Sequence, residues 1–176
     1  ALRRTRARTL ALFAAYEKAL AASKLAVPFS PEVNPPLWEL GHIGWFQEWW
    51  IARNQERTLG VACNPDSARG PSRLASADSL YDSSRVPHGD RWSLPVPGTQ
   101  AARQYLNDVL DDTLALLDSC SEDDASLYFF RLVLLHEDMH SEAAVYMAQA
   151  LGIPLPEEVA FPQREMTPAA GHRESM

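Results

Sequence analysis

Two histidines four residues apart stand out in the segment Leu-His-Glu-Asp-Met-His at residues 135–140. On a helix, residues at this spacing lie one turn apart on the same face, so His136 and His140 can bind the same metal ion. Apolar residues recur around them at spacings of three and four, which predicts that this face points toward the core. The residues of that predicted core stripe are Leu132, Leu135, Met139, Ala143, Met147 and Ala150.

A third histidine, His42, lies in an earlier helical segment among Trp38, Trp45 and Trp49, which we interpret as packing residues. If the two helical segments are neighbours in a bundle, His42 reaches the same point as the other two histidines. Three imidazole ligands would leave positions on a metal open for water, substrate or dioxygen, which is typical of a catalytic site. The predicted metal ligands are therefore His42, His136 and His140.

The same segment satisfies the H-E-x-x-H pattern of zinc peptidases, in which Glu137 would be the general base. The longer metzincin pattern is not met, because Ala143 and Tyr146 stand where a glycine and a third histidine are required. A peptidase is therefore disfavoured, and Glu137 is expected to lie behind the ligands or at the surface. A second alternative stays open, namely a helical module that a metal stabilises and that binds a partner without catalysis.

Helical periodicity predicts the elements that must position these residues. Helices are expected over residues 2–23, 34–57, 99–118 and 121–151, with Asn34 and Ser121 as N-caps of the second and fourth. The arginines near the N-terminus, Arg6 among them, are expected to be solvated. Because no segment shows the alternation of a strand, the fold class expected is all-α, an antiparallel four-helix bundle.

A long segment between the second and third helices, residues 58–97, lacks periodicity and is rich in proline and glycine. Loops beyond about 12 to 15 residues in a compact domain are usually disordered or functional, and the aromatic and polar residues here favour an ordered loop. Arg85, His88 and Arg91 lie close together with Asp90. Such a group is suited to a polar or anionic small molecule, and a surface salt-bridge cluster is an equal alternative.

The composition limits the remaining possibilities. The chain has 176 residues, of which 46% are hydrophobic and 22% charged, as expected of one globular domain. A formal net charge of -7 argues against nucleic acid as a partner, and no apolar run approaches the roughly 20 residues of a membrane span. Cys63 and Cys120 are expected to be free thiols, which indicates a cytoplasmic protein.

Two stretches together resemble a known family. Residues 34–48 read Asn-Pro-Pro-Leu-Trp-Glu-Leu-Gly-His-Ile-Gly-Trp-Phe-Gln-Glu, and residues 136–143 read His-Glu-Asp-Met-His-Ser-Glu-Ala. Both resemble the N-terminal DinB-like domain of the ergothioneine-biosynthesis sulfoxide synthases, the EgtB-like enzymes. The resemblance implies a DinB-like bundle over residues 1–155, and a linker over 156–176 toward a C-terminal catalytic domain similar to formylglycine-generating enzymes.

The resemblance also implies a cofactor and a reaction. In that family the matching histidines, here His42, His136 and His140, bind non-heme Fe(II). The enzymes use dioxygen to join C2 of the imidazole of hercynine, the trimethylated betaine of histidine, to a chalcogen donor. The resemblance names no residue of this chain for proton transfer, so the catalytic acid or base is left unassigned.

Two departures from the family bear on the donor. Members that use gamma-glutamylcysteine commonly have glutamine just before the last histidine ligand, whereas this chain has Met139. Residues 84–92 do not reproduce their arginine pattern and look more like the loop of selenoneine synthases, which take a selenosugar. The expected reaction is therefore carbon–selenium bond formation, with carbon–sulfur chemistry as the alternative. The expected substrate-binding residues are Arg85, His88, Arg91 and Met139.

Overall fold

The computed structural model describes residues 1–160, and every regular element in that range is helical. This confirms the all-α class. The four long helices are α1 (Leu2–Ala19), α2 (Pro36–Trp50), α4 (Thr99–Asp118) and α5 (Asp124–Ala150). The shorter elements are the helices α3 (Ala77–Tyr81) and α6 (Glu157–Ala160) and the 3-10 turns η1 (Ala21–Ser23), η2 (Arg57–Ala62) and η3 (His88–Trp92).

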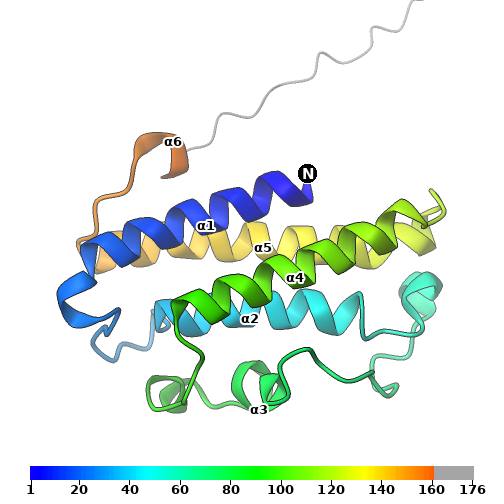
Figure 1. The fold of residues 1–176 in the computed structure, drawn as a ribbon, viewed down its shortest axis with the longest axis horizontal. Coiled ribbons are helices and arrows are strands. Elements are labelled where there is room, and N and C mark those ends of the chain that lie inside the picture. Colours follow the sequence, from blue (N-terminus) through cyan, green and yellow to red (C-terminus); the bar gives the residue numbers. More distant parts are fainter. Residues whose placement is uncertain (161–176) are drawn as a thin grey trace, which may run out of the picture.

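The four long helices pack side by side in a bundle (Figure 1). The chain enters α2 and α4 from the same end, and α1 and α5 run the opposite way. Parallel neighbours need a long connection, and residues 51–98 provide it by returning along the bundle. The expected long, ordered loop is therefore present, and it contains α3, η2 and η3.

Several expected helix boundaries were wrong. Helix α2 ends at Trp50 rather than near residue 57, because the Asn54 side chain accepts a hydrogen bond from the Glu56 N–H at 3.0 Å and forms a turn instead. Helix α1 ends at Ala19 and is followed by η1. The observed N-cap residues also differ from the predicted ones.

Both predicted N-caps, Asn34 for the second long helix and Ser121 for the fourth, were wrong. Asp123, not Ser121, caps α5, and its carboxylate accepts a hydrogen bond from the Ser126 N–H at 2.9 Å. Helix α2 has Pro35 at its N-cap position without a side-chain cap, and the Asn34 amide donates to Glu39 instead. Asn34 thus serves the site described below rather than the helix end.

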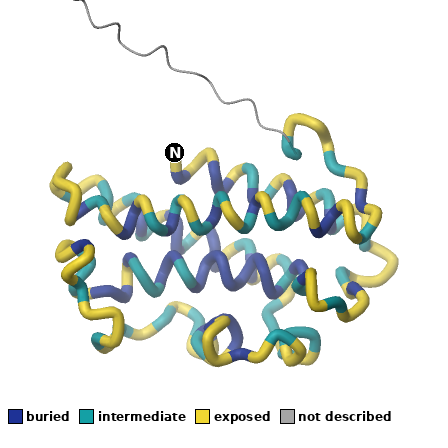
Figure 2. The backbone as a smooth tube through the Cα atoms, turned by 180° about the vertical axis from the view of Figure 1, so that it is seen from behind, coloured by how far each residue is buried: buried dark blue, intermediate teal, exposed yellow. Residues whose placement is uncertain are grey.

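Helix α2 lies at the centre of the bundle and has no exposed residue (Figure 2). Its two glycines make room for neighbouring aromatic residues. A Cβ added at Gly41 would lie 2.1 Å from the ring of Tyr81, and one added at Gly44 would lie 3.0 Å from Leu106 and 3.1 Å from Tyr105. Gly41 therefore permits the close packing of the long loop against α2.

The buried face of α5 matches the predicted one only in part. Leu135 is 65% exposed and Met139 is 53% exposed, while Glu137 and Ser141 are buried. The apolar residues of the buried face lie toward both ends of the helix, and of these only Met147 belongs to the predicted stripe: Phe129, Phe130, Val133, Met147 and Ala148. The hydrophobic spacing predicted the wrong residues for part of this face, because polar side chains of α1 form hydrogen bonds with the buried polar groups of α5.

Those polar groups meet at Arg6, which is 2% exposed and not solvated as predicted. Arg6 Nε donates to Glu137 Oε1 at 2.7 Å, and Nη2 donates to Glu137 Oε2 at 3.0 Å. The guanidinium also donates to Gln47 Oε1 at 2.5 Å and to the Leu106 carbonyl. One side chain of α1 thus binds groups on α5, α2 and α4.

Among residues 1–160, no helix combines the length and hydrophobicity that a bilayer crossing requires. Cys63 and Cys120 are free and partly buried, as predicted. The linker expected over residues 156–176 falls mostly outside the described residues, and its described part contains α6. The domain division at residue 155 therefore stays a prediction.

We expect Arg6→Ala to lower the free energy of unfolding by about 3 to 5 kcal/mol, because it leaves the buried Glu137 carboxylate without its partner. Urea unfolding followed by circular dichroism measures this change. The exposed Arg4 on the same helix is the control, and Arg4→Ala should stay within about 0.5 kcal/mol of the unchanged protein. Equal effects of the two substitutions would contradict the role given to Arg6.

Candidate metal centre

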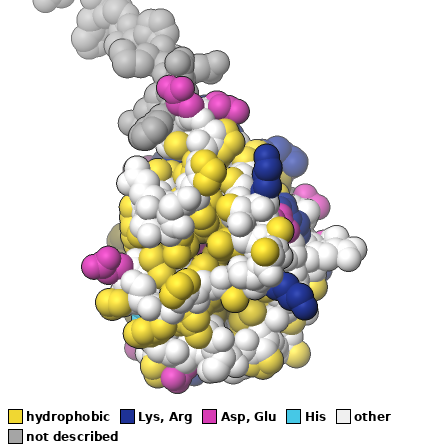
Figure 3. Space-filling model, turned by 90° about the vertical axis from the view of Figure 1, so that its left-hand side faces the viewer, with side chains coloured by type: hydrophobic (Ala, Val, Ile, Leu, Met, Phe, Trp, Pro, Cys, Tyr) yellow, Lys and Arg dark blue, Asp and Glu magenta, His cyan; other side chains and the backbone are white. Residues whose placement is uncertain are grey.

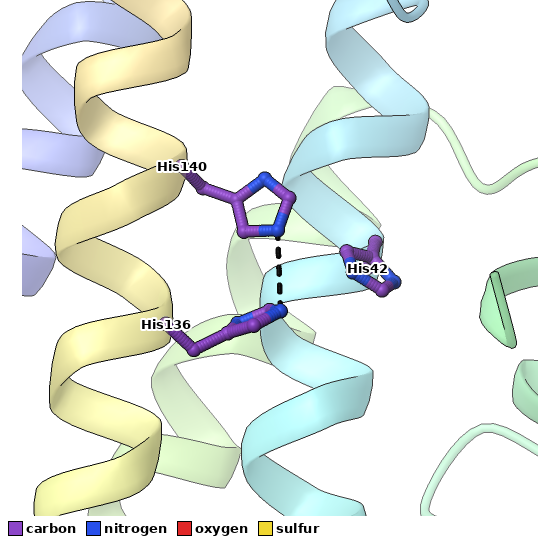
Figure 4. A group of neighbouring side chains, drawn as sticks. All are labelled: His42, His136 and His140. Atoms are coloured by element: carbon purple, nitrogen blue, oxygen red, sulfur yellow. Dashed lines mark hydrogen bonds between the residues drawn. The ribbon is translucent and has the colours of Figure 1, made fainter.

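The three predicted histidines lie together between α2 and α5 (Figure 4). One ring nitrogen from each of His42, His136 and His140 lies within 4.8 Å of the others. The Nε2 atoms of His136 and His140 are 3.2 Å apart, and the ring of His42 lies 5.0 Å from that of His140. The structure thus brings together side chains separated by about 100 residues of sequence.

Hydrogen bonds to the outer ring nitrogens orient two of the imidazoles. His42 Nδ1 donates to the backbone carbonyl of Tyr81 at 2.8 Å, and His140 Nδ1 donates to Glu39 Oε2 at 2.6 Å. A proton held on Nδ1 leaves the lone pair of Nε2 free for a metal.

Aromatic rings hold the imidazoles from the sides. The ring of His136 stacks on Phe46 with 3.5 Å between centroids and 4° between planes. His42 stacks on Trp38 at 4.9 Å and 8°, and Trp38 Nε1 donates to the Leu80 carbonyl at 2.7 Å. Trp45 also stacks on His42, with 5.8 Å between centroids, so two of the tryptophans expected as packing residues pack directly on a candidate ligand.

Burial keeps the imidazoles of His42 and His136 neutral. Desolvation, followed by the charge of His140, lowers the pKa of His42 to about 4 and that of His136 to about 2. A metal needs the neutral form of histidine, so these shifts favour metal binding at neutral and mildly acidic pH. Three imidazole nitrogen donors fit a divalent transition metal such as iron or zinc.

Glu39 was not predicted as part of the site. Burial raises the pKa of its carboxyl, but hydrogen bonds from His140 and Asn34 outweigh burial, and the net pKa lies below the usual range. It is therefore the anionic partner of a ligand histidine, an arrangement that usually accompanies bound metals. Its position three residues before His42, on the same face of α2, was the sequence signal that could have identified it.

Glu137 cannot serve as the general base of a zinc peptidase. Both of its carboxylate oxygens accept hydrogen bonds from Arg6, and Thr9 Oγ1 donates to Oε1 at 2.8 Å. The side chain is 3% exposed and contacts α1. The sequence predicted Glu137 either behind the ligands or at the surface. In the structure it is buried and is the ion-pair partner of Arg6.

The loop residues expected to bind substrate point to different partners. Arg85 is 77% exposed and pairs with Asp82 at 3.3 Å, and His88 bonds the Val33 carbonyl at 2.9 Å. Only Arg91 extends toward the histidines, with its guanidinium 4.0 Å from the centre of the Trp38 ring. Their roles in substrate binding stay predictions.

Arg91 is also joined to a candidate ligand by hydrogen bonds. Its Nη1 donates to Asn34 Oδ1 at 2.8 Å, the Asn34 amide donates to Glu39, and Glu39 accepts from His140. Met139, the fourth expected substrate residue, is half exposed on α5 next to His140. A path of side chains therefore links η3 of the long loop to the histidine cluster.

The profile of the DinB superfamily matches residues 1–147. The chain belongs to the DinB superfamily. This agrees with the all-helical fold.

Three curated relatives of this DinB domain are each named hercynine oxygenase. The protein of Mycolicibacterium smegmatis is 35% identical over 140 residues, which cover 73% of this chain and 29% of the relative. Those of Mycolicibacterium thermoresistibile and Mycobacterium tuberculosis are 31% and 32% identical, covering 74% and 86% of this chain. The match spans only 26% and 31% of those two relatives. The chain thus corresponds to under a third of each of these proteins.

We expect the metal-free protein to lose stability as the pH falls from about 6.5 toward 4. In that window the unfolded chain protonates His42 and His136 and the folded chain does not, which costs up to about 1.4 kcal/mol per pH unit for each histidine. Urea unfolding at a series of pH values measures the slope. His136→Asn should reduce it, His88→Ala should leave it unchanged, and a flat profile would contradict burial of neutral imidazoles.

Proposed function

We propose that this chain is the metal-binding domain of a non-heme Fe(II), dioxygen-dependent enzyme that acts on hercynine. The observation that carries the proposal is the convergence of His42, His136 and His140, two of them oriented by hydrogen bonds at Nδ1. The similarity to hercynine oxygenases supports iron over zinc and supports the substrate. The reaction proposed joins imidazole C2 of hercynine to selenium from a selenosugar.

In this proposal the three histidines would hold Fe(II), which supplies the binding and reduction of dioxygen beside the chalcogen donor. Because imidazole ligands carry no charge, the ion would keep its positive charge and would favour an anionic selenolate or thiolate as donor. The residues of this chain mainly position the reactants. Phe46 and Trp38 hold the rings of His136 and His42 in place, and Glu39 fixes that of His140.

Proton transfer is assigned to no residue of this domain. The two buried carboxylates nearest the histidines are already engaged, Glu39 by His140 and Asn34, and Glu137 by Arg6. We therefore place the catalytic acid or base on a C-terminal domain similar to formylglycine-generating enzymes. The exposed apolar side chains of Leu135, Met139 and Tyr146 on α5, next to the ligands, support a covering domain at this face.

The choice of donor rests on the sequence. Met139 stands where thiol-using members commonly have glutamine, and the loop resembles that of selenoneine synthases. The similarity to hercynine oxygenases keeps carbon–sulfur bond formation with gamma-glutamylcysteine as the alternative. Arg91, which lies against Trp38, is the loop residue best placed to contact a bound donor.

Replacing any one of His42, His136 or His140 with alanine should abolish stoichiometric Fe(II) binding and reduce turnover of hercynine at least about 100-fold, because two ligands do not hold the ion. Metal analysis of protein purified without oxygen and an assay of dioxygen uptake measure both effects. His88→Ala is the matched control and should retain its iron. Tightly bound zinc without hercynine-dependent dioxygen uptake would favour the metal-stabilised binding module.

Met139→Gln should shift donor preference toward gamma-glutamylcysteine, because an amide beside His140 can hydrogen-bond a polar substrate group where a thioether cannot. We expect the ratio of kcat/KM for the selenosugar to that for the thiol to fall at least about 10-fold. Competition assays with hercynine and both donors measure it. Leu135→Gln, at an equally exposed apolar position, should leave the ratio unchanged. If the unmodified protein prefers the thiol, the selenium assignment fails.

A further inference from the structure

A partly enclosed cavity of about 40 Å³ lies between α1, α2 and α5, and one of the three histidines, His140, is part of its lining. Glu39 and His140 form the wall nearest the cluster. The apolar part of the lining comes from all three helices and includes Leu12, Phe13, Leu40, Ile43, Ala144 and Met147. Helix α1 thus contributes to a space that touches a candidate metal ligand.

The polar side chains in the wall are already hydrogen-bonded within the protein. Glu39 accepts from His140 and Asn34, and Tyr16 donates to the Ala144 carbonyl. Thr9 Oγ1 bonds Glu137 at 2.8 Å and the hydroxyl of Ser141 at 3.3 Å. A water molecule needs two to four polar partners, so it gains little in this cavity, whereas a small apolar molecule loses nothing by entering.

The surface at this end of the bundle is also poor in charge. Viewed from that end, hydrophobic and uncharged side chains occupy the centre, and charged side chains lie toward the margins (Figure 3). The cavity lining includes Tyr16, near the C-terminal end of α1, and Pro36, the first residue of α2. The cavity therefore extends toward the end of the bundle whose surface is poor in charge.

We propose that this cavity is a binding pocket for a small apolar gas and that it holds dioxygen next to His140. The assignment of dioxygen rests on the proposed function, whereas the pocket itself does not. Dioxygen is uncharged and gains by leaving water for an apolar space. Hercynine and the donor are polar and would reach the histidines from outside this cavity. A gas pocket beside His140 would therefore give dioxygen a route separate from theirs.

Xenon is the probe for the pocket, because it binds dry apolar cavities and takes no part in the chemistry. We expect xenon under pressure to bind the complete protein at this cavity, as seen by xenon NMR or in xenon-derivatised crystals. Leu12→Ala enlarges the cavity and should bind xenon more tightly, while Ala144→Leu fills it and should abolish binding. Leu12→Phe serves as a second filling variant if Ala144→Leu does not fold.

A matched control separates cavity size from loss of stability. Leu110 is buried in a different cluster and does not line the cavity, so Leu110→Ala destabilises the core without changing the pocket. It should bind xenon as the unmodified protein does. Absence of xenon from the unmodified protein, or equal binding in the filled variant, overturns the pocket.

The rate at which nitric oxide binds the Fe(II)-loaded protein tests the role in gas delivery, since nitric oxide is a small, weakly polar stand-in for dioxygen. At equal iron content, we expect the filling variants to bind nitric oxide at least about three-fold more slowly, and to show an equally raised KM for dioxygen with kcat retained. Unchanged rates in variants that exclude xenon overturn the delivery role. If the unmodified protein binds no iron, the proposed function and the dioxygen role both fail, and the xenon result still decides the pocket.

Discussion

The buried ion pair between Arg6 and Glu137 is the interaction on which the geometry of the bundle depends. Taking both charges out of water is costly, and the pair is tolerated because the guanidinium and both carboxylate oxygens find partners. Its members lie on α1 and α5, and its additional partners lie on α2 and α4. Because Glu137 follows His136 directly, the pair also fixes the rotation of α5 that turns both of its histidines toward α2.

The three histidines of the cluster are held in place by different interactions. His42 and His140 are each held by a hydrogen bond at Nδ1, one to the protein backbone and one to a carboxylate. His136 instead rests on the face of Phe46, and its Nε2 is hydrogen-bonded to that of His140 at 3.2 Å. A bond at Nδ1 leaves Nε2 free for a metal, whereas the bond between His136 and His140 uses both Nε2 atoms and must break when an ion binds them.

The sequence predicted what local spacing encodes. The pair His136 and His140, the tryptophan-flanked His42, the four long helices and the ordered loop all follow from short-range patterns. The burial of Arg6 does not follow from such patterns, because its partner Glu137 lies 131 residues away and the sequence around Arg6 does not indicate an ion pair. The exposure of Leu135 and Met139 was missed for the same reason, since a polar face of α5 is buried only where α1 supplies matching groups. Glu39 was missed because a carboxylate in a helix is usually solvated.

The absence of exposed residues in α2 limits how this domain can change over evolutionary time. A helix with one solvent face can vary along that face at little cost, but every position of α2 contacts another part of the protein. Here Gly41 accommodates an aromatic ring, Trp38 packs on His42, and Gln47 bonds Arg6. Neutral drift is therefore restricted mainly to α1, α4 and the outer face of α5, and new substrate preferences are more readily acquired from the loop and from α5 than from the helix that carries His42.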